Sequence, residues 1–407
     1  MASTSSRLLP PQMRLFTQLC SRGQSLPYSP RALSIFHFQN RGSSSRYFTT
    51  QPPRRSQSTS AHPMPKFTYH AAASFSGKGK RLDPNSNVFQ FNPYNRVQPQ
   101  IKRPKSKRPA SGQDAFFIAR MGDTNAVAFG VADGVGGWEE SGVDPADFSH
   151  SFCDYMALAA YETKPDDARR LTAKALMQKG YDDVCLDKSI PAGGSTACVA
   201  IVSEDGVMDV ANLGDSGFVH LRLNGVHHSS EAQTHAFNTP YQLSIIPPSM
   251  LARAAAFGGA QLCDYPKDAD VTAHELRHGD VLVFASDGLW DNLFDQDVLR
   301  IASRAMTGSG AWKATDGGIR VVDDLTSYVQ AQDSEPKSAT LQSAIALEIL
   351  ATAKRASMDQ RLDGPFAKEV QKYYPGEDWH GGKVDDICVI VVVVSEDGKP
   401  QAIKAKL

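Results

Sequence analysis

Four aspartates in this sequence stand directly beside short apolar, partly β-branched runs, the pattern of strands buried in a sheet. A carboxylate at the end of a strand is held firmly by the sheet, yet it projects from the sheet edge. Several carboxylates that converge there repel one another unless a cation lies between them. The pattern therefore favours a fold in which several strand ends meet. The four are Asp114, Asp133, Asp287 and Asp385.

The side chains at these strand ends have the chemistry of a site for hard divalent cations. Mg²⁺ and Mn²⁺ accept all-oxygen ligands, keep several waters and leave positions open for phosphate. A glycine follows both Asp133 and Asp287, so the backbone can turn tightly there, and the Gly134 carbonyl can point at a metal. A single Asp-Gly pair is more often a turn than a ligand. Its recurrence beside apolar runs is what favours a metal site.

The order of the expected elements indicates layers of helices and sheets. Helices cluster between runs of strands, which argues for an α+β domain and against the strict alternation of a doubly wound sheet. A capping aspartate and a proline, Asp144 and Pro145, mark the start of the first helix. Strands are expected over 115–119, 126–132, 196–202, 207–212, 218–223, 280–285 and 388–394, and helices over 146–162, 165–186 and 340–357.

The first 60 residues have the composition of a mitochondrial presequence. They hold eight arginines among many serines, and no Asp or Glu occurs before Asp83. Such basic, acid-free segments form transient amphipathic helices that serve import. A chloroplast transit peptide and a disordered basic tail are the alternatives. Nucleic-acid binding is not expected, because aromatic and basic residues do not interleave here.

Composition changes divide the rest of the chain. Residues 61–107 are rich in Pro, Ser, Asn and basic residues and are expected to form a linker or peripheral segment. The folded domain is expected over 108–396, with a surface insertion at 303–338, and 397–407 as a C-terminal tail. No apolar run reaches the 18 to 20 or so residues that span a bilayer, so no integral membrane segment is expected.

Five motifs, in this order, resemble those of the metal-dependent type 2C (PPM) serine/threonine protein phosphatases. The resemblance covers about residues 111–394 and implies that family's fold, an α-β-β-α sandwich of two antiparallel sheets flanked by helices. The ending GVGGW at 134–138 and FNTPYQL at 237–243 further resemble the mitochondrial branch of the family. The motifs are GVADGVGGW at 130–138, GSTA at 194–197, ANLGDSG at 211–217, ASDGLWD at 285–291 and KVDDI at 383–387.

The resemblance implies roles for individual residues. Asp133 would bridge two Mn²⁺ or Mg²⁺ ions, and the Gly134 carbonyl would bind one of them. Asp287 and Asp385 would complete the binuclear site. Asp114 would act through metal-bound water, and Asp215 would help to hold a weaker third ion.

The implied reaction is hydrolysis of phosphoserine and phosphothreonine by a water activated between two metal ions, with no catalytic side chain as nucleophile. The absence of a Cys-x5-Arg loop fits this chemistry. The resemblance also implies a mitochondrial protein, imported by the organelle's machinery and acting in the matrix. Its substrates would be phosphorylated matrix proteins, including those of coenzyme Q metabolism.

Three positions depart from the family pattern. Val135 stands where many relatives carry a histidine that protonates the leaving group, so a metal-bound water or another acid must take over. Gln113 stands where many have Glu, and we expect it behind the metal waters. The family's phosphate-binding arginine would fall near Pro109, and Arg108 is its neighbour. Two alternatives follow: a metal-binding pseudophosphatase scaffold and a hydrolase of a small phosphoester.

The presequence can be tested by import. Residues 1–60 fused to a fluorescent protein should carry it into mitochondria, and an uncoupler should abolish the uptake because the arginines respond to the membrane potential. A matched fusion with the eight arginines changed to glutamine should stay in the cytosol. A native fusion that remains cytosolic, together with full-length protein outside the organelle, would contradict the prediction.

Overall fold

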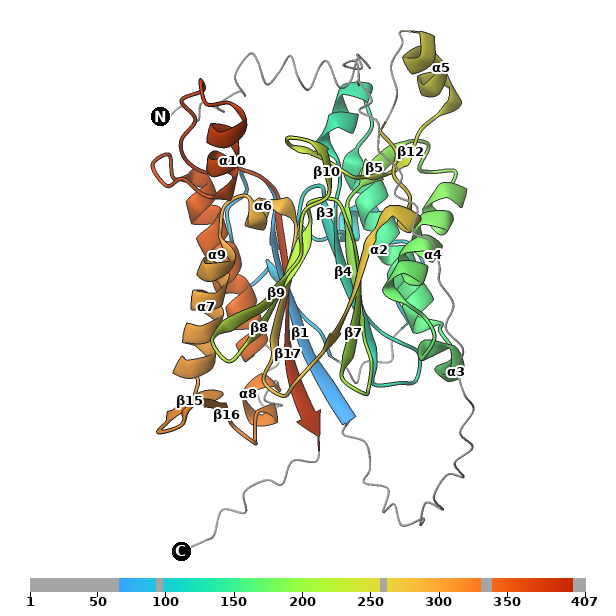
Figure 1. Ribbon diagram of the computed structural model, residues 1–407. Coiled ribbons are helices and arrows are strands. Elements are labelled where there is room, and N and C mark those ends of the chain that lie inside the picture. The colour runs from blue at the N-terminus through green and yellow to red at the C-terminus, as the bar shows by residue number, and fades with distance from the viewer. Residues whose placement is uncertain (1–65, 93–97, 257–261, 331–338, 398–407) are drawn as a thin grey trace, which may run out of the picture.

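Two antiparallel β-sheets pack face to face, and helices cover the outer face of each (Figure 1). The computed structural model describes residues 66–92, 98–256, 262–330 and 339–397. The predicted α-β-β-α sandwich is confirmed. The expected presequence, residues 1–60, lies outside the described residues, as does the expected tail apart from Asp397.

The first sheet has six strands in the order β2-β1-β17-β14-β8-β9, and every neighbouring pair is antiparallel. Its two middle strands are β17 and β14, and β1 pairs with β17 over eleven residues although the two strands come from opposite ends of the described chain. The bounds are β1 (Lys66–Ser76), β2 (Val88–Gln90), β8 (Gly217–Arg222), β9 (Gly225–Ser229), β14 (Val281–Ala285) and β17 (Ile387–Asp397).

The second sheet has five strands in the order β13-β7-β6-β4-β3, again all antiparallel. Four of the five match expected strands; β13 does not, since half-exposed polar residues alternate along it without an apolar run. The bounds are β3 (Asp114–Arg120), β4 (Val127–Asp133), β6 (Ala197–Val202), β7 (Val207–Leu213) and β13 (Asp270–Glu275).

Aromatic rings hold the two sheets together. Between the sheets, Phe129 of β4 meets Phe284 of β14 edge to face with 5.0 Å between ring centroids, and within the six-stranded sheet Phe218 of β8 stacks on Phe284 at 4.9 Å. All three rings are buried in one apolar cluster between the sheets. Such ring pairs add about 0.5–1.5 kcal/mol beyond the burial of their area, so this contact fixes how the sheets lie against each other.

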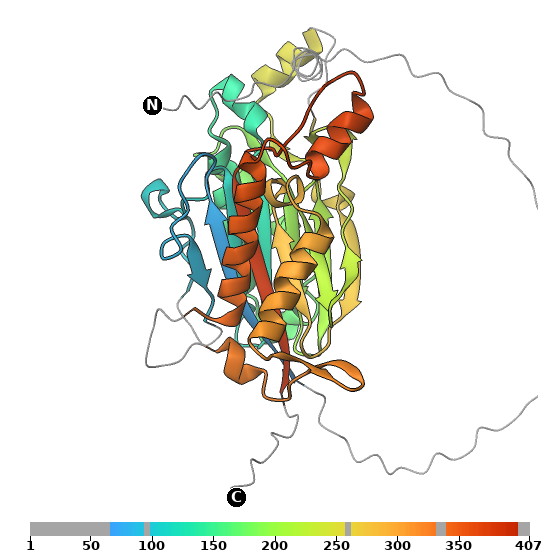
Figure 2. The same cartoon turned by 90° about the vertical axis from the view of Figure 1, so that its left-hand side faces the viewer.

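Long helices cover the outer faces. Helices α7 and α9 pack on the six-stranded sheet, where they lie side by side in Figure 2, and α2 and α4 pack on the five-stranded sheet. Asp144 accepts a hydrogen bond from the Ala146 amide and Pro145 opens α2, as the sequence predicts. The bounds are α2 (Pro145–Tyr161), α4 (Ala173–Leu186), α7 (Asp295–Gly308) and α9 (Leu341–Met358).

Short elements connect this framework. The helix expected over 165–186 is divided into α3 and α4, because Thr172 caps a new helix by accepting a hydrogen bond from the Ala175 amide. No helix within the described ranges combines the length and the apolar character needed to cross a bilayer. The short elements are α3 (Pro165–Ala168), α5 (Pro248–Ala256), α6 (Asp287–Trp290), α8 (Thr326–Val329), α10 (Pro365–Tyr373), β5 (Gly193–Ser195), β10 (Thr234–Ala236), β11 (Thr239–Pro240), β12 (Leu243–Ile245), β15 (Trp312–Thr315), β16 (Gly318–Val321) and the 3₁₀ turns η1 (Lys105–Lys107), η2 (Gly136–Ser141) and η3 (Pro266–Asp268).

The interpretation of 61–107 as a linker or peripheral segment is wrong for its first part. Strand β1 lies inside the six-stranded sheet between β2 and β17, and its alternate residues Tyr69, Ala71, Ala73 and Phe75 are buried between the sheets. The folded domain therefore begins at Lys66 and not at residue 108. Small alanines in place of Val and Ile leave this strand without a strong strand signal, although residues 69–76 are all buried.

The expected surface insertion at 303–338 is also partly wrong. Its first residues complete α7, and the β15–β16 hairpin follows with several exposed residues. Trp312, however, is only 1% exposed and donates its indole hydrogen to the Gly279 carbonyl at 3.1 Å. Leu325 and Val329 are buried in the same cluster beneath α7 and α9. This segment therefore closes one end of that core.

The aromatic contact between the sheets gives a stability prediction. Replacing Phe284 by alanine should lower the free energy of unfolding by about 3–5 kcal/mol, because the ring is fully buried and leaves a cavity. Val271→Ala on β13, where the side chain is 48% exposed, is the control and should change it by less than about 0.5 kcal/mol. Urea unfolding of both variants measures the difference. Equal midpoints would contradict the assigned core.

Candidate active site

Strand register brings the predicted aspartates to one edge of the sandwich. Asp114 at the start of β3 lies opposite Asp133 at the end of β4. In the other sheet, Ala285 pairs with both Gly217 and Val389. Asp287 follows Ala285 by two residues and Asp215 precedes Gly217 by two, while Asp385 lies just before β17. Two sheets thus contribute strand ends to one place.

The glycines after Asp133 and Asp287 are required by close packing. Neither has a positive φ, so a tight turn is not their purpose. A Cβ on Gly288 would lie 1.9 Å from the Asp386 carbonyl oxygen, and one on Gly134 would lie 2.9 Å from the Pro145 carbonyl oxygen. The two segments that carry Asp287 and Asp385 can therefore approach each other only because residue 288 has no side chain.

Hydroxyl groups hold the cluster from behind. Ser286 donates to Asp114 Oδ2 at 2.6 Å, so the end of β14 is joined to the start of β3. Ser195 donates to the Asp133 carbonyl at 2.8 Å, and the Asp133 amide donates to Thr196 Oγ1 at 3.1 Å. Thr196 Oγ1 also lies 2.8 Å from Ser216 Oγ, next to Asp215. These contacts fix the carboxylates in position across both sheets.

Burial and mutual repulsion make the cluster electrostatically unfavourable. Burial, and then the charges of neighbouring carboxylates, raise the pKa values of Asp114, Asp133 and Asp215 well above the ordinary range. For Asp133 the neighbours include Asp287 and Asp385. One carboxylate oxygen of Asp114 and one of Asp215 are buried with no hydrogen-bond partner in the described structure. The cluster is therefore short of positive charge.

Lys383 supplies one positive charge, which the sequence analysis missed. Its ammonium lies 2.6 Å from Asp287 Oδ2, 2.6 Å from Asp291 Oδ2 and 3.3 Å from Asp385 Oδ2. Burial acts to raise the pKa of Asp287, but the Lys383 charge outweighs it and lowers that pKa below its usual value. Burial raises the pKa of Asp291 to about 7, although Lys383 opposes the shift.

The donor set fits hard divalent cations. It consists of carboxylate oxygens from two sheets, two of them unpartnered, which is the ligand type that Mg²⁺ and Mn²⁺ prefer. In the described ranges no three His, Cys, Asp or Glu side chains already stand close enough to hold an ion. It is the Lys383 ammonium that gathers Asp287, Asp291 and Asp385. A divalent cation would have to share these oxygens with the lysine.

Gln113 lies at the wall of the site. Its backbone amide donates to Asp386 Oδ2 at 2.7 Å, and this bond joins the start of β3 to the residue just before β17. Its side chain donates to Glu139 Oε1 at 2.6 Å, on the exposed turn η2 that follows Asp133. Whether Gln113 influences a metal is not tested by these contacts and stays a prediction.

Arg108 does not face the carboxylate cluster and lies in a separate pocket. Its guanidinium lies 2.9 Å from Asp147 Oδ1, in a basic pocket of about 370 Å³ that also includes Lys102, Arg103 and Lys105. No contact in the described structure joins it to the carboxylate cluster. Val135 at the N-cap of η2 has no group that could carry a proton. Phosphate binding by Arg108 stays a prediction.

Sequence reasoning assigned no role to Lys383, Asp291 or Ser286, although all three lie inside the recognised motifs. Lys383 precedes the Val-Asp-Asp motif, and Asp291 follows Asp287 by four residues, the spacing of one helical turn. Ser286 lies inside the Ser-Asp-Gly motif itself. Their local patterns are weak signals, since each side chain acts on a residue distant in sequence.

Curated relatives match most of the chain. The chain is 30% identical over 331 residues to protein phosphatase 2C homolog 7, mitochondrial, of Saccharomyces cerevisiae, covering 81% of this chain and 83% of that protein. It is 33% identical to the protein phosphatase PTC7 homolog of Xenopus laevis, covering 70% and 82% respectively. The chain belongs to the PTC7-like PP2C-type protein phosphatases. No protein-family model matches it.

A solved structure supports the fold of this PP2C-type phosphatase. The photosystem II phosphatase PBCP is 26% identical, has a TM-score of 0.50 and covers 69% of this chain and 91% of its own. The predictions of family, of fold and of protein serine/threonine phosphatase activity are thereby confirmed.

Repulsion in the cluster predicts how stability depends on pH without metal. Because the pKa of Asp133 is raised above its ordinary 3.8, the folded state keeps a proton that the unfolded state loses. The free energy of unfolding should therefore fall as the pH rises above about 3.8. In EDTA at pH 7, Asp133→Asn should melt at a higher temperature than the parent, and this gain should vanish below pH 3.8.

Asp270→Asn, on an exposed residue of β13, is the matched control and should melt like the parent at both pH values. If Asp133→Asn melted lower than the parent in EDTA at pH 7, the assigned repulsion would be wrong.

Proposed function

We propose that this PP2C-type phosphatase works with two Mn²⁺ or Mg²⁺ ions and that Asp133, Asp287, Asp385 and the Gly134 carbonyl hold them. The observation that carries the proposal is the concentration of buried carboxylates with raised pKa values and unpartnered oxygens at one edge of the sandwich. Such a cluster is stable only with more positive charge than Lys383 supplies.

The chain's own residues position the reaction. Two bound ions would supply an activated water and neutralise the charge of the phosphoryl oxygens. Asp133 ends β4, is held by Ser195 and Thr196, and feels the charges of Asp287 and Asp385, so it would bind both ions. Asp114 is oriented by Ser286, so its unpartnered Oδ1 can accept a hydrogen bond from a water. Asp215 is proposed to hold a weaker third ion.

Lys383 has a supporting role in this proposal. Its ammonium keeps Asp287 and Asp291 close to each other in spite of their like charges. An inactive scaffold, in which the lysine would take the place of a cation, is the second candidate, but membership of the PTC7-like PP2C-type phosphatases favours the enzyme. A hydrolase of a small phosphoester is the third alternative. Hydrolysis of p-nitrophenyl phosphate with added Mn²⁺ separates the first two.

We further propose that the substrates are phosphoserine and phosphothreonine proteins of the mitochondrial matrix, among them proteins of coenzyme Q metabolism. The name of the yeast relative, a mitochondrial phosphatase homolog, supports the compartment. The acid-free, arginine-rich start of the chain agrees with it. A comparison of phosphothreonine peptides with sugar phosphates, at equal concentrations, tests the substrate class.

Loss of one metal carboxylate should abolish activity while the fold survives. Asp133→Asn and Asp287→Asn each remove a ligand, and Asp133→Asn also relieves repulsion. We expect Mn²⁺-dependent hydrolysis of p-nitrophenyl phosphate to fall to background in both, with circular dichroism unchanged. Asp316→Asn, between β15 and β16, is the control with normal activity. Activity in EDTA, or in both variants, would rule out the binuclear site.

Gln113 provides a finer test of the site. Gln113→Glu adds a negative charge at the wall of the cluster, so it should lower the Mn²⁺ concentration for half-maximal activity by about 10-fold, with a smaller effect on the saturated rate. The control is Gln98→Glu, because Gln98 also donates to a glutamate, Glu162 at 3.2 Å, at the far end of α2. Superimposable metal titrations of parent and Gln113→Glu would mean that Gln113 does not face the metal waters.

A further inference from the structure

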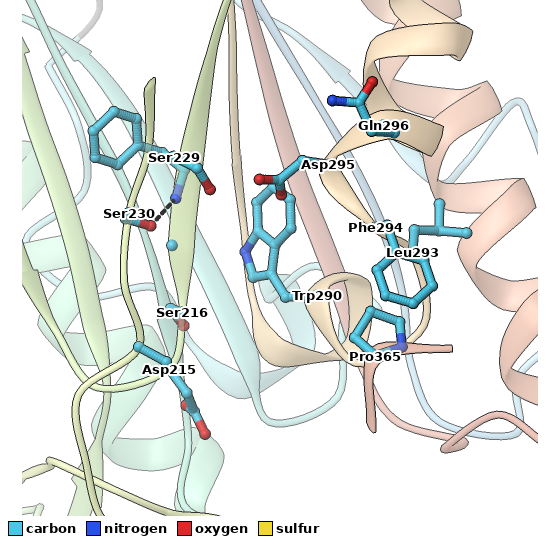
Figure 3. A pocket seen from close by; sticks show the side chains of 13 residues that line it. Asp215, Ser216, Ser229, Ser230, Trp290, Leu293, Phe294, Asp295, Gln296 and Pro365 are labelled. Atoms are coloured by element: carbon cyan, nitrogen blue, oxygen red, sulfur yellow. Dashed lines mark hydrogen bonds between the residues drawn. The ribbon is translucent and has the colours of Figure 1, made fainter. Parts of the chain in front are cut away.

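A pocket of about 410 Å³ opens beside the carboxylate cluster, between the β8–β9 hairpin and the segment that joins α6 to α7 (Figure 3). Trp290 stands in the middle of this view, with Ser229 and Ser230 at the end of β9 on one side and Leu293, Phe294 and Pro365 on the other. None of the roles assigned above uses this pocket, apart from that of Asp215.

The pocket is shaped by fixed groups. Trp290 donates its indole hydrogen to the Ala285 carbonyl at 2.9 Å, so the ring cannot turn away. Ser230 Oγ accepts a hydrogen bond from the Phe218 amide at 2.8 Å, and a Cβ on Gly217 would lie 2.4 Å from the same oxygen. Phe294 remains 46% exposed although it is a large apolar side chain. A preformed pocket with apolar walls is the usual form of a binding site.

The charge of the pocket is negative. Its lining includes Asp215 and Asp295 and, in the described part of the chain, no Lys, Arg or His. Asp295 is half-buried at the start of α7, and no described residue makes an ion pair or hydrogen bond with its carboxylate. Aromatic walls beside an unpaired carboxylate suit a side chain with an apolar stem and a cationic head, because arginine and lysine stack on aromatic rings and pair with carboxylates.

The pocket is continuous with the cluster. Asp215 belongs to both, and its pKa is raised in part by the charge of Asp287. Trp290 follows Asp287 by three residues in the single turn of α6, so their Cβ atoms are about 5–6 Å apart. In an extended peptide, residues two positions apart lie on the same face and are separated by about 6.5–7 Å. A phosphorylated residue at the cluster therefore brings a residue two positions away within reach of the pocket.

We propose that this pocket binds an arginine or lysine side chain of the phosphoprotein substrate, two positions from the phosphorylated residue, with Asp295 as its charge partner. The proposal rests on the phosphatase function proposed above and adds a rule of substrate selection. Asp295 and Trp290 are specificity residues and take no part in hydrolysis.

The test uses the full chain with Mn²⁺ at low salt and two sets of phosphothreonine peptides. Within each set the peptides differ only at the residue two positions before, or two positions after, the phosphothreonine, which is Arg, Ala, Leu or Glu. In at least one of the two sets we expect kcat/KM to be about tenfold higher for the Arg peptide than for the Ala peptide, with the Glu peptide lowest. Salt at 1 M should reduce the preference, since the Debye length falls to about 3 Å.

Three variants assign the preference to the pocket. Asp295→Asn should erase the advantage of Arg over Ala, and Asp295→Lys should reverse the order so that Glu becomes the better peptide. Asp316→Asn makes the same charge change on the β15–β16 hairpin, away from the pocket, and should leave the preference intact. Hydrolysis of p-nitrophenyl phosphate, which has no such side chain, should be equal in all three variants and the parent.

The outcomes separate this inference from the proposed function. A parent that hydrolyses p-nitrophenyl phosphate but shows no preference for Arg in either set would overturn the inference alone. The same follows if the preference persists in Asp295→Asn, or if Leu is the best residue, which would make the pocket an apolar subsite. A parent inactive on every substrate would overturn the proposed function and the inference with it.

Discussion

The repulsion among buried carboxylates is the interaction on which the rest of the site depends. Asp114, Asp133, Asp215 and Asp287 are held together by the register of two sheets, although their charges oppose it. The hydroxyls behind them, and the missing side chain at Gly288, make that approach possible. The rigid sandwich thus holds a site that is complete only with added positive charge, and this couples metal binding to stability.

Sequence reasoning succeeded where the signal is local. The strands beside Asp114, Asp133 and Asp287 are apolar runs, and each aspartate lies at or within two residues of a strand end, so strand and carboxylate are read from the same few residues. The cap of α2 is local in the same way, with Asp144 accepting from the Ala146 amide two residues on. Such features depend little on the rest of the fold.

The sequence was least informative where a residue's partner is distant. Lys383 acts on Asp287, 96 residues away, and Ser286 acts on Asp114, 172 residues away. Strand β1 was missed for a related reason, because its alanines acquire a role only against the strand that covers them. Trp312 was assigned to the surface from its polar neighbours, although its ring closes the core. Tertiary context outweighed local propensity in each case.

The pairing of β1 with β17 has a consequence for the order of folding. These strands come from the first and last parts of the described chain, and β17 joins β1 to β14 within the six-stranded sheet. That sheet cannot be completed until the polypeptide has been delivered to its end, since a half-made chain lacks the neighbour on which both β1 and β14 depend. Contacts of such high sequence separation make folding slow. Enzymatic activity therefore appears only after β17 is available, and a chain that ends before Ile387 lacks the strand that joins β1 to β14.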